Sequence, residues 1–314
     1  MPTPTVLIAT WRDGLFTITG DSIRHEFAGR TLCGLTRARD GGALAILDRH
    51  SVGRLTRAGE WQLVAEVDRS LVCCLELGDA IYAGTEDARV LRIDARGRCE
   101  PLDAFDSAPG REKWYAGAAL IDGKLIGPPL GVRSMAATCD GVALLVNVHV
   151  GGIPRSLDGG RSWQPTLDIE LDVHEVTAHP SRPNVVAAAS AAGLCTSRDG
   201  GATWTLEREG LHAHYCSAVA FAGDDLLVAA SADHFVAEGA IYRRPVDGSG
   251  PLLPLDGGFP RWLSGICDTD CMDVSASSIA LADRAGNLYR SEDLGRTWSC
   301  RATGAKSPSA VALI

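Results

Sequence analysis

Ser156-Leu157-Asp158-Gly159-Gly160-Arg161-Ser162-Trp163 is the stretch of sequence that decides the fold. The same pattern, Ser-x-Asp-x-Gly-x-Ser/Thr-Trp, returns at 197–204 and at 291–298. In each copy the aspartate can accept hydrogen bonds from backbone N–H groups of its own turn, and the glycine permits a positive φ. The tryptophan begins the next strand and offers a large ring for burial between repeats. Three copies in one chain indicate an internal repeat built on hairpin turns.

The spacing of the copies gives the size of the repeating unit. Trp163 and Trp204 are 41 residues apart, and Trp204 and Trp298 are 94 apart, which is twice 47. Two degenerate copies, at 56–61 and 94–99, end 38 residues apart at Trp61 and Cys99. Propeller repeats of this kind run about 40–50 residues. The period predicts one four-stranded blade per repeat, with the octapeptide turn between its third and fourth strands.

The octapeptide resembles the Asp-box, or bacterial neuraminidase repeat, of sialidases, sortilin-like receptors, some glucanases and the photosystem II stability-factor group. The strict match covers 24 of the 314 residues. The resemblance implies a β-propeller. It leaves the function open, because these propellers bind and cleave very different molecules.

We therefore expect an all-β chain folded as a seven-bladed β-propeller of four-stranded antiparallel blades. The N-terminal stretch 5–28 holds only three strands, and the C-terminal tail is a lone apolar strand. We predict that the C-terminal strand completes the N-terminal blade, which closes the ring and leaves no open edge. Residues 106–132, with the turn Gly127-Pro128-Pro129, exceed the period and are predicted to form a loop inserted over one face. A single domain, 1–314, is predicted, with blades at 308–314 plus 5–28, 32–67, 71–105, 133–167, 173–209, 215–255 and 264–303.

Composition narrows the class of partner and the compartment. Hydrophobic residues make up 46% of the chain, enough for a core, and the net charge of −9 without a basic run disfavours nucleic acid and anionic membranes. No apolar run is long enough to span a membrane, and the first residues lack the basic and apolar segments of a signal peptide. Most of the ten cysteines lie in apolar strand segments, so we expect reduced core thiols and a cytoplasmic location.

Strand order assigns polar residues to one face of the ring. In a propeller, the start of each inner strand and the end of each second strand open on the same face, and the octapeptide turns face the other way. Six of the eight histidines map to this first face, five of them from three consecutive blades. Neutral imidazole is the commonest metal ligand, so the cluster predicts a divalent transition metal, Zn, Cu, Fe or Ni. The predicted ligands are His149, His174, His214 and His234. The alternative is that these histidines are loop residues or satisfied core residues.

Other polar residues of the same face supply groups for catalysis and substrate binding. Glu175, Tyr215 and Asp233 are predicted acid–base groups, or partners that orient the metal ligands. Four arginines are predicted to hold a substrate carboxylate or phosphate, although solvated arginines around a channel mouth are an equal alternative. They are Arg133, Arg12, Arg49 and Arg284.

Three functions remain open from the sequence. The first is a metal-dependent enzyme that acts on a small molecule in the central pocket. The second is a non-catalytic propeller that binds a protein partner or assists assembly. Sialidase-like glycoside hydrolysis is the third and least favoured, because the Arg-Ile-Pro motif of that family is missing near the N-terminus. Only Tyr215 among the five tyrosines is expected on the channel.

Overall fold

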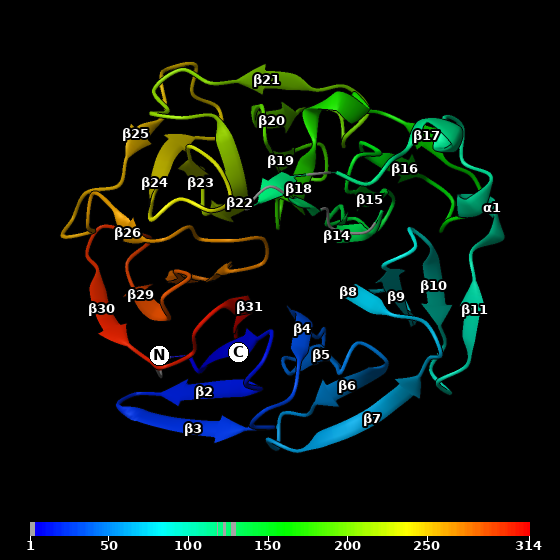
Figure 1. The fold of residues 1–314 in the computed structure, drawn as a ribbon, viewed down its shortest axis with the longest axis horizontal. Helices are drawn as coiled ribbons and strands as arrows, with labels where there is room; N and C mark the ends of the chain where they lie inside the picture. Colours follow the sequence, from blue (N-terminus) through cyan, green and yellow to red (C-terminus); the bar gives the residue numbers. More distant parts are fainter. Residues whose placement is uncertain (1–3, 118, 122–123, 127–129) are drawn as a thin grey trace.

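A computed structural model describes residues 4–117, 119–121, 124–126 and 130–314. Seven antiparallel sheets surround a central axis as the blades of a propeller (Figure 1). The prediction of an all-β, seven-bladed propeller is confirmed. Within the described residues the only α-helix is the single turn α1 (Asp103–Asp106), and no helix is long and apolar enough to cross a membrane.

Strands follow one another from the axis outward in each blade. The first blade consists of β31 (Pro308–Leu313), β1 (Val6–Thr10), β2 (Leu15–Thr19) and β3 (Ser22–Glu26). The second consists of β4 (Leu32–Arg37), β5 (Ala43–Leu47), β6 (Ser51–Leu55) and β7 (Trp61–Glu66). The third consists of β8 (Leu71–Leu77), β9 (Ala80–Thr85), β10 (Val90–Ile93) and β11 (Cys99–Pro101).

The remaining blades continue in chain order. The fourth consists of β14 (Val132–Ala137), β15 (Leu144–Val148), β16 (Pro154–Ser156) and β17 (Gln164–Pro165). The fifth consists of β18 (Val173–Ala178), β19 (Val186–Ser190), β20 (Gly193–Ser197) and β21 (Thr205–Glu207). The sixth consists of β22 (Tyr215–Ala222), β23 (Asp225–Ser231), β24 (Glu238–Pro245) and β25 (Leu253–Pro254). The seventh consists of β27 (Met272–Ser275), β28 (Ser278–Ala282), β29 (Asn287–Ser291) and β30 (Ser299–Ala302).

The C-terminal strand closes the ring as predicted. β31 pairs antiparallel with β1, with Leu313 opposite Val6 and Val311 opposite Ile8. The two chain ends therefore lie together at the inner edge of the first blade (Figure 1). One boundary differs from the prediction. The predicted last blade begins at Ser264, but β26 (Leu263–Ser264) pairs with β24 of the sixth blade.

The segment between β11 and β14, which includes the stretch 106–132 predicted as surplus to the blade period, has several short elements among its described residues. They are α1, a 3-10 turn at Arg111–Lys113, and a two-stranded sheet of β12 (Ala119–Ile121) and β13 (Lys124–Ile126). The segment is tied to the fourth blade where the Tyr115 N–H donates to the Val150 carbonyl at 3.2 Å. The predicted turn Gly127-Pro128-Pro129 lies outside the described residues.

The hydrophobic core is divided among the blade interfaces. Buried residues of the described chain form seven clusters, and each cluster joins two neighbouring blades. Both faces of each sheet are therefore covered, which explains the alanine- and valine-rich strands. Each blade is stabilised mainly through its neighbours, so the closed ring is the unit that buries the apolar surface.

The three octapeptides adopt the same turn between the third and fourth strands. The aspartates Asp158, Asp199 and Asp293 each accept a bond from the backbone N–H four residues later, at 2.8 to 2.9 Å. The first serine of each copy donates to the same carboxylate at 2.8 Å. Bonds from the hydroxyl groups and N–H groups of the turn lower the pKa of Asp158 and Asp293 to about 2, and they outweigh burial at Asp199.

The tryptophan that ends each octapeptide packs into the interface with the preceding blade. Trp163 is only 3% exposed and lies 4.9 Å, centroid to centroid, from the Phe105 ring. Trp204 and Trp298 contact the equivalent clusters of their own blades. The sequence prediction that these rings are buried between repeats is confirmed for Trp163, whereas Trp204 and Trp298 are half-buried at the same kind of interface.

Replacement of Trp163 by alanine is expected to lower the free energy of unfolding by about 3–5 kcal/mol, because a large buried ring is lost and a cavity remains. Urea denaturation of the two proteins measures the change. Leu157→Ala is the control in the same turn, since Leu157 is 54% exposed and its loss is expected to cost less than about 0.5 kcal/mol. Equal effects of the two substitutions would contradict the packing role of Trp163.

Candidate site at the mouth of the central channel

The inner strands share an irregularity that shapes the channel mouth. Six of the seven, all except β27, have a register shift near their first residues that leaves at least one residue unpaired. A bulge of this kind re-aims side chains relative to strict strand alternation. The unpaired residues include Gly34, Val72, Arg133, His174, Ser217 and Ser309.

A cavity of about 210 Å³ opens at this ring of bulges. It is lined by four of the bulge residues together with His149, Asp268 and Asp270. An outer cavity of about 460 Å³ shares Trp11, Asp268 and Pro308 with it, so the two are continuous. A third cavity, of about 330 Å³, lies at the far end of the inner strands and is also lined by Asp270.

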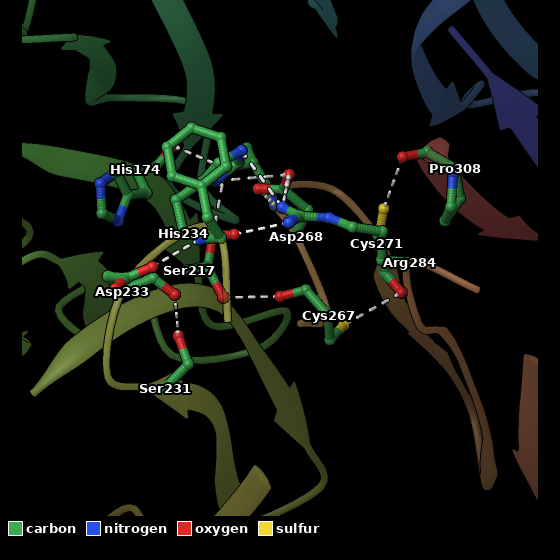
Figure 2. Close-up of polar contacts among 12 residues, drawn as sticks. His174, Ser217, Ser231, Asp233, His234, Cys267, Asp268, Cys271, Arg284 and Pro308 are labelled. Carbon is green, nitrogen blue, oxygen red and sulfur yellow. Dashed lines mark hydrogen bonds and ion pairs between the residues drawn. The ribbon is translucent and has the colours of Figure 1, made fainter. Parts of the chain in front are cut away.

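The connector between β26 and β27 brings Asp270 to the axis. The Thr269 hydroxyl donates to the His174 carbonyl at 3.4 Å or the Ser217 carbonyl at 3.3 Å. The Ser217 hydroxyl in turn donates to the Cys267 carbonyl at 2.6 Å, a contact that Figure 2 shows. Asp270 itself has a left-handed backbone, with φ of 59°. These contacts hold the connector against two inner strands and leave the Asp270 side chain at the cavity.

Asp172 lies between two of the predicted histidines. Its Oδ1 is 3.2 Å from His149 Nε2, and its Oδ2 is 3.8 Å from His174 Nε2. His174 Nδ1 donates to the Cys216 carbonyl at 2.6 Å, because a carbonyl oxygen can only accept. Burial, helped by the positive charge of Arg133, lowers the pKa of His149 to about 4. His149 is therefore neutral at pH 7.

A second cluster, His234, Asp268 and Arg284, forms the floor of the outer cavity (Figure 2). Arg284 donates to the His234 carbonyl at 2.6 Å and lies 3.1 Å from His234 Nε2, which therefore accepts. Asp268 Oδ2 is 3.9 Å from His234 Nδ1. Burial lowers the pKa of His234, and the charge of Arg284 acts in the same direction against Asp268.

The three predicted acid–base residues have different surroundings. The Tyr215 ring lies between His174 and His234, at centroid distances of 4.4 and 6.4 Å, and burial raises its pKa. Asp233 is exposed, and its carboxylate accepts a bond from the Phe235 N–H at 2.6 Å, which stabilises the loop. Glu175 is 7% exposed and lines the far cavity.

Glu175 and Asp270 form a pair of carboxyl groups deep in the channel. Glu175 Oε2 accepts bonds from the N–H groups of Val219 and Asp270, both at 3.3 Å. Burial raises the pKa of Glu175 well above its ordinary value. Burial and the charge of Asp268 raise the pKa of Asp270 to about 7, although Arg133 opposes this shift. The raised pKa makes Asp270 a candidate acid–base group at the cavity wall.

The four predicted substrate-binding arginines do not assemble into one clamp. Arg49 Nη2 is paired with Glu86 Oε1 at 2.5 Å, Arg284 is held by the second cluster, and Arg12 is exposed on the rim. Arg133 lines the inner cavity, and among the described residues its side chain has no hydrogen-bond or ion-pair partner. It is the one cation of the four that is both in the cavity and available to a ligand.

The predicted metal ligands are also separated. His149 and His174 share Asp172, His234 belongs to the second cluster, and His214 is exposed. His149 Nδ1 accepts from the Gly117 N–H at 3.4 Å, so the proton of the neutral ring is on Nε2. In this state Nε2 has no lone pair with which to bind a metal ion. No group of three or more His, Cys, Asp or Glu side chains in the described part of the chain is arranged to hold a metal ion. The residues present therefore do not fit the predicted metal, which stays a prediction from the sequence.

Three residues of the site were not predicted from the sequence: Asp172, Asp268 and Asp270. Asp172 directly precedes an inner strand, which is the position from which His174 was selected, so the same rule could have found it. Asp268 and Asp270 lie in a connector without periodicity. Their only signal is an acidic pair between Cys267 and Cys271.

Comparison with known proteins shows the fold. No family model matches the chain, and no curated protein matches its sequence. Virginiamycin B lyase from Staphylococcus aureus is similar in structure, with a TM-score of 0.59 and 12% identity over 86% of this chain and 83% of that chain. YCF48 bound to a D1 peptide has a TM-score of 0.58 and 16% identity over 89% and 84%. A GH74 xyloglucanase from Xanthomonas campestris has 0.56 and 18%, over 86% of this chain and 45% of its own. These β-propellers differ in function, so identities this low carry no activity to the chain.

Proposed function

We propose that the chain binds a small anionic molecule in the inner cavity and transfers a proton to or from it, with Arg133 as the anion anchor and Asp270 as the acid–base group. The observation that carries the proposal is that two groups line the same cavity: a guanidinium with no partner in the part of the chain that the structure describes, and a carboxyl group with a pKa of about 7. Guanidinium groups bind carboxylates and phosphates through paired, charge-assisted hydrogen bonds.

The surroundings of Asp270 suit general acid–base chemistry. A catalytic group works best when its pKa is near the working pH, and burial is the usual means of raising a carboxyl pKa that far. His149 and Tyr215 are both uncharged at pH 7, since the pKa of the first is lowered and that of the second is raised. They place uncharged polar groups around the ligand and leave the gain and loss of a proton to Asp270.

Binding of a small carboxylate is expected to be tighter at pH 6 than at pH 8, by about tenfold. The sign follows from the raised pKa of Asp270, to about 7. Protonation of Asp270 below pH 7 removes one of the negative charges that oppose Arg133 in the cavity, and above pH 7 the Asp270 carboxylate repels an anionic ligand. Calorimetric titration with propionate, benzoate and 3-phenylpropionate at the two pH values measures the difference. These probes stay fully ionised throughout the range.

Asp270→Asn is the matched variant, because it keeps the shape and removes the charge. It is expected to bind the probes equally at pH 6 and pH 8. A pH difference that persists in this variant would assign the titration to another group. Failure of every anion to bind the wild-type protein would overturn the proposal itself.

A second candidate function is binding of a protein partner, the alternative left open by the sequence. It is supported by two exposed aromatic side chains on the same face but outside the cavities, Tyr115 and Trp262. YCF48 bound to a D1 peptide gives a peptide-binding precedent on a similar fold. Loss of partner capture in Trp262→Ala, in a protein whose wild-type form binds none of the carboxylate probes, would favour this function over the first.

Family membership and location are also proposals. The three identical turns support assignment to the Asp-box propellers, and sialidase-like hydrolysis gains no support because the arginines do not converge. A cytoplasmic location is supported by the ten cysteines, all of which are free thiols. Cell fractionation with an antibody against the protein tests the location.

A further inference from the structure

All four exposed aromatic side chains of the described residues lie on the face that carries the candidate site. They are Trp11, Tyr115, Phe235 and Trp262. Trp11 and Phe235 lie in loops between the second and third strands of their blades. Tyr115 bridges to Val150, just after the second strand β15, and Trp262 directly precedes β26, which pairs with the start of β24. The opposite face has no exposed aromatic residue among those described, so the distribution is one-sided.

Two of these rings, Trp11 and Phe235, line the outer cavity. Trp11 is 36% exposed and Phe235 is 59% exposed. A large apolar side chain left in water forgoes about 1.5–3 kcal/mol of burial. Aromatic rings kept at the wall of a cavity therefore mark it as a place where an apolar ligand group is covered.

Each of the two residues has contacts at the cavity wall, Trp11 with the second blade and Phe235 within its own loop. The Trp11 carbonyl accepts from the Thr31 hydroxyl at 2.9 Å, and the Arg49 guanidinium lies 6.0 Å from the Trp11 ring centroid. The Phe235 ring stands edge-on to the His234 ring, with centroids 4.8 Å apart. These loops present ordered aromatic walls at the entrance to the inner cavity.

The inner cavity alone is too small for most ligands. Its volume is about 210 Å³, whereas ligand pockets are usually about 300–1,000 Å³. It joins the outer cavity of about 460 Å³ through the shared residues Trp11, Asp268 and Pro308. A ligand that fills both cavities therefore contacts Arg133 at one end and the aromatic walls at the other.

We propose that the ligand has two parts: an anionic head bound at Arg133 in the inner cavity, and an aromatic or similarly flat apolar group bound beside Trp11 and Phe235 in the outer cavity. The inference deepens the proposed function and rests on it for the position of the head. Arg12 and Arg284 also line the outer cavity, which disfavours a cationic tail.

Calorimetric titration with 3-phenylpropionate and propionate at pH 6 tests the inference, because the two probes differ only in the ring. We expect 3-phenylpropionate to bind at least about tenfold more tightly than propionate, since a covered ring adds apolar burial. Phe235→Ala is expected to remove about tenfold of the affinity for 3-phenylpropionate and to leave propionate binding unchanged, because Phe235 lines the outer cavity and not the inner one. Phe235→Tyr keeps a flat ring and is expected to retain most of the affinity.

Trp262→Ala is the matched control, because Trp262 is 40% exposed on the same face and lines neither cavity. It is expected to change neither affinity. Equal affinities of the two probes, with propionate still bound through Arg133, would overturn the two-part ligand and leave the proposed function intact. Absence of binding by every carboxylate would overturn the proposed function and the inference with it.

Discussion

Replacement of Arg133 by methionine is expected to weaken carboxylate binding in the inner cavity by about a hundredfold, because buried charge-assisted contacts to an anion cost about 2–5 kcal/mol when one partner is removed. The methionine keeps most of the side-chain length, so the cavity is expected to persist. The measurement is calorimetric titration with 3-phenylpropionate at pH 6. Arg12→Met is the control, because Arg12 is exposed on the rim of the outer cavity.

A second readout of Arg133→Met does not depend on any ligand. The positive charge of Arg133 helps burial to lower the pKa of His149 to about 4. Removal of that charge is expected to raise the pKa of His149 toward its ordinary range, which NMR titration of the imidazole protons would record. An unchanged His149 titration, together with unchanged carboxylate affinity, would show that Arg133 does not face the cavity.

Replacement of Val311 by aspartate is expected to remove more than about 4 kcal/mol of the free energy of unfolding, the largest stability effect that we foresee. Val311 is the middle of the closing strand and packs with Ile8 and Ala280 in the cluster between the seventh and first blades. An ionised carboxylate at position 311 would lack an ion-pair partner. The Val311 backbone N–H also donates to the Asp270 carbonyl at 2.7 Å, so the closing strand supports the site.

Urea denaturation followed by circular dichroism measures this loss. Should Val311→Asp fail to fold, Val311→Ala keeps the test open, with an expected loss of about 1–3 kcal/mol. Val142→Asp is the matched control, because Val142 is 53% exposed in a turn. Its expected effect is within about 0.5 kcal/mol. Similar losses at the two positions would mean that closure by β31 contributes little to stability.

The octapeptides made the fold predictable because their requirements are local. A carboxylate that bonds its own turn, a glycine with positive φ and a tryptophan at a strand start are conditions that a few adjacent residues satisfy by themselves. Their spacing then implied the number of blades. The lone apolar strand at 308–313 had one free position to occupy, beside the three strands of the first blade.

The site was less predictable because it depends on register and on long connections. Strand order correctly brought His149 and His174 together, and Asp172 joins them. The strict alternation of side chains between the two faces of a strand fails at Arg133 and His174, because both residues are unpaired at bulges. The residue pattern does not predict where a bulge lies. Asp270 reaches the axis from a connector whose path is set by contacts with distant strands. Such contacts carry no periodic signal.

The pairing of β31 with β1 also has a kinetic consequence. The paired residues Val6 and Leu313 are about 300 positions apart, and bringing two such points together costs on the order of 5 kcal/mol of chain entropy. Until β31 is synthesised, the first blade has an unpaired strand edge and its neighbours have uncovered apolar faces. We therefore expect folding to be slow and to pass through an open-ring intermediate that aggregates, so that refolding yield falls as protein concentration rises.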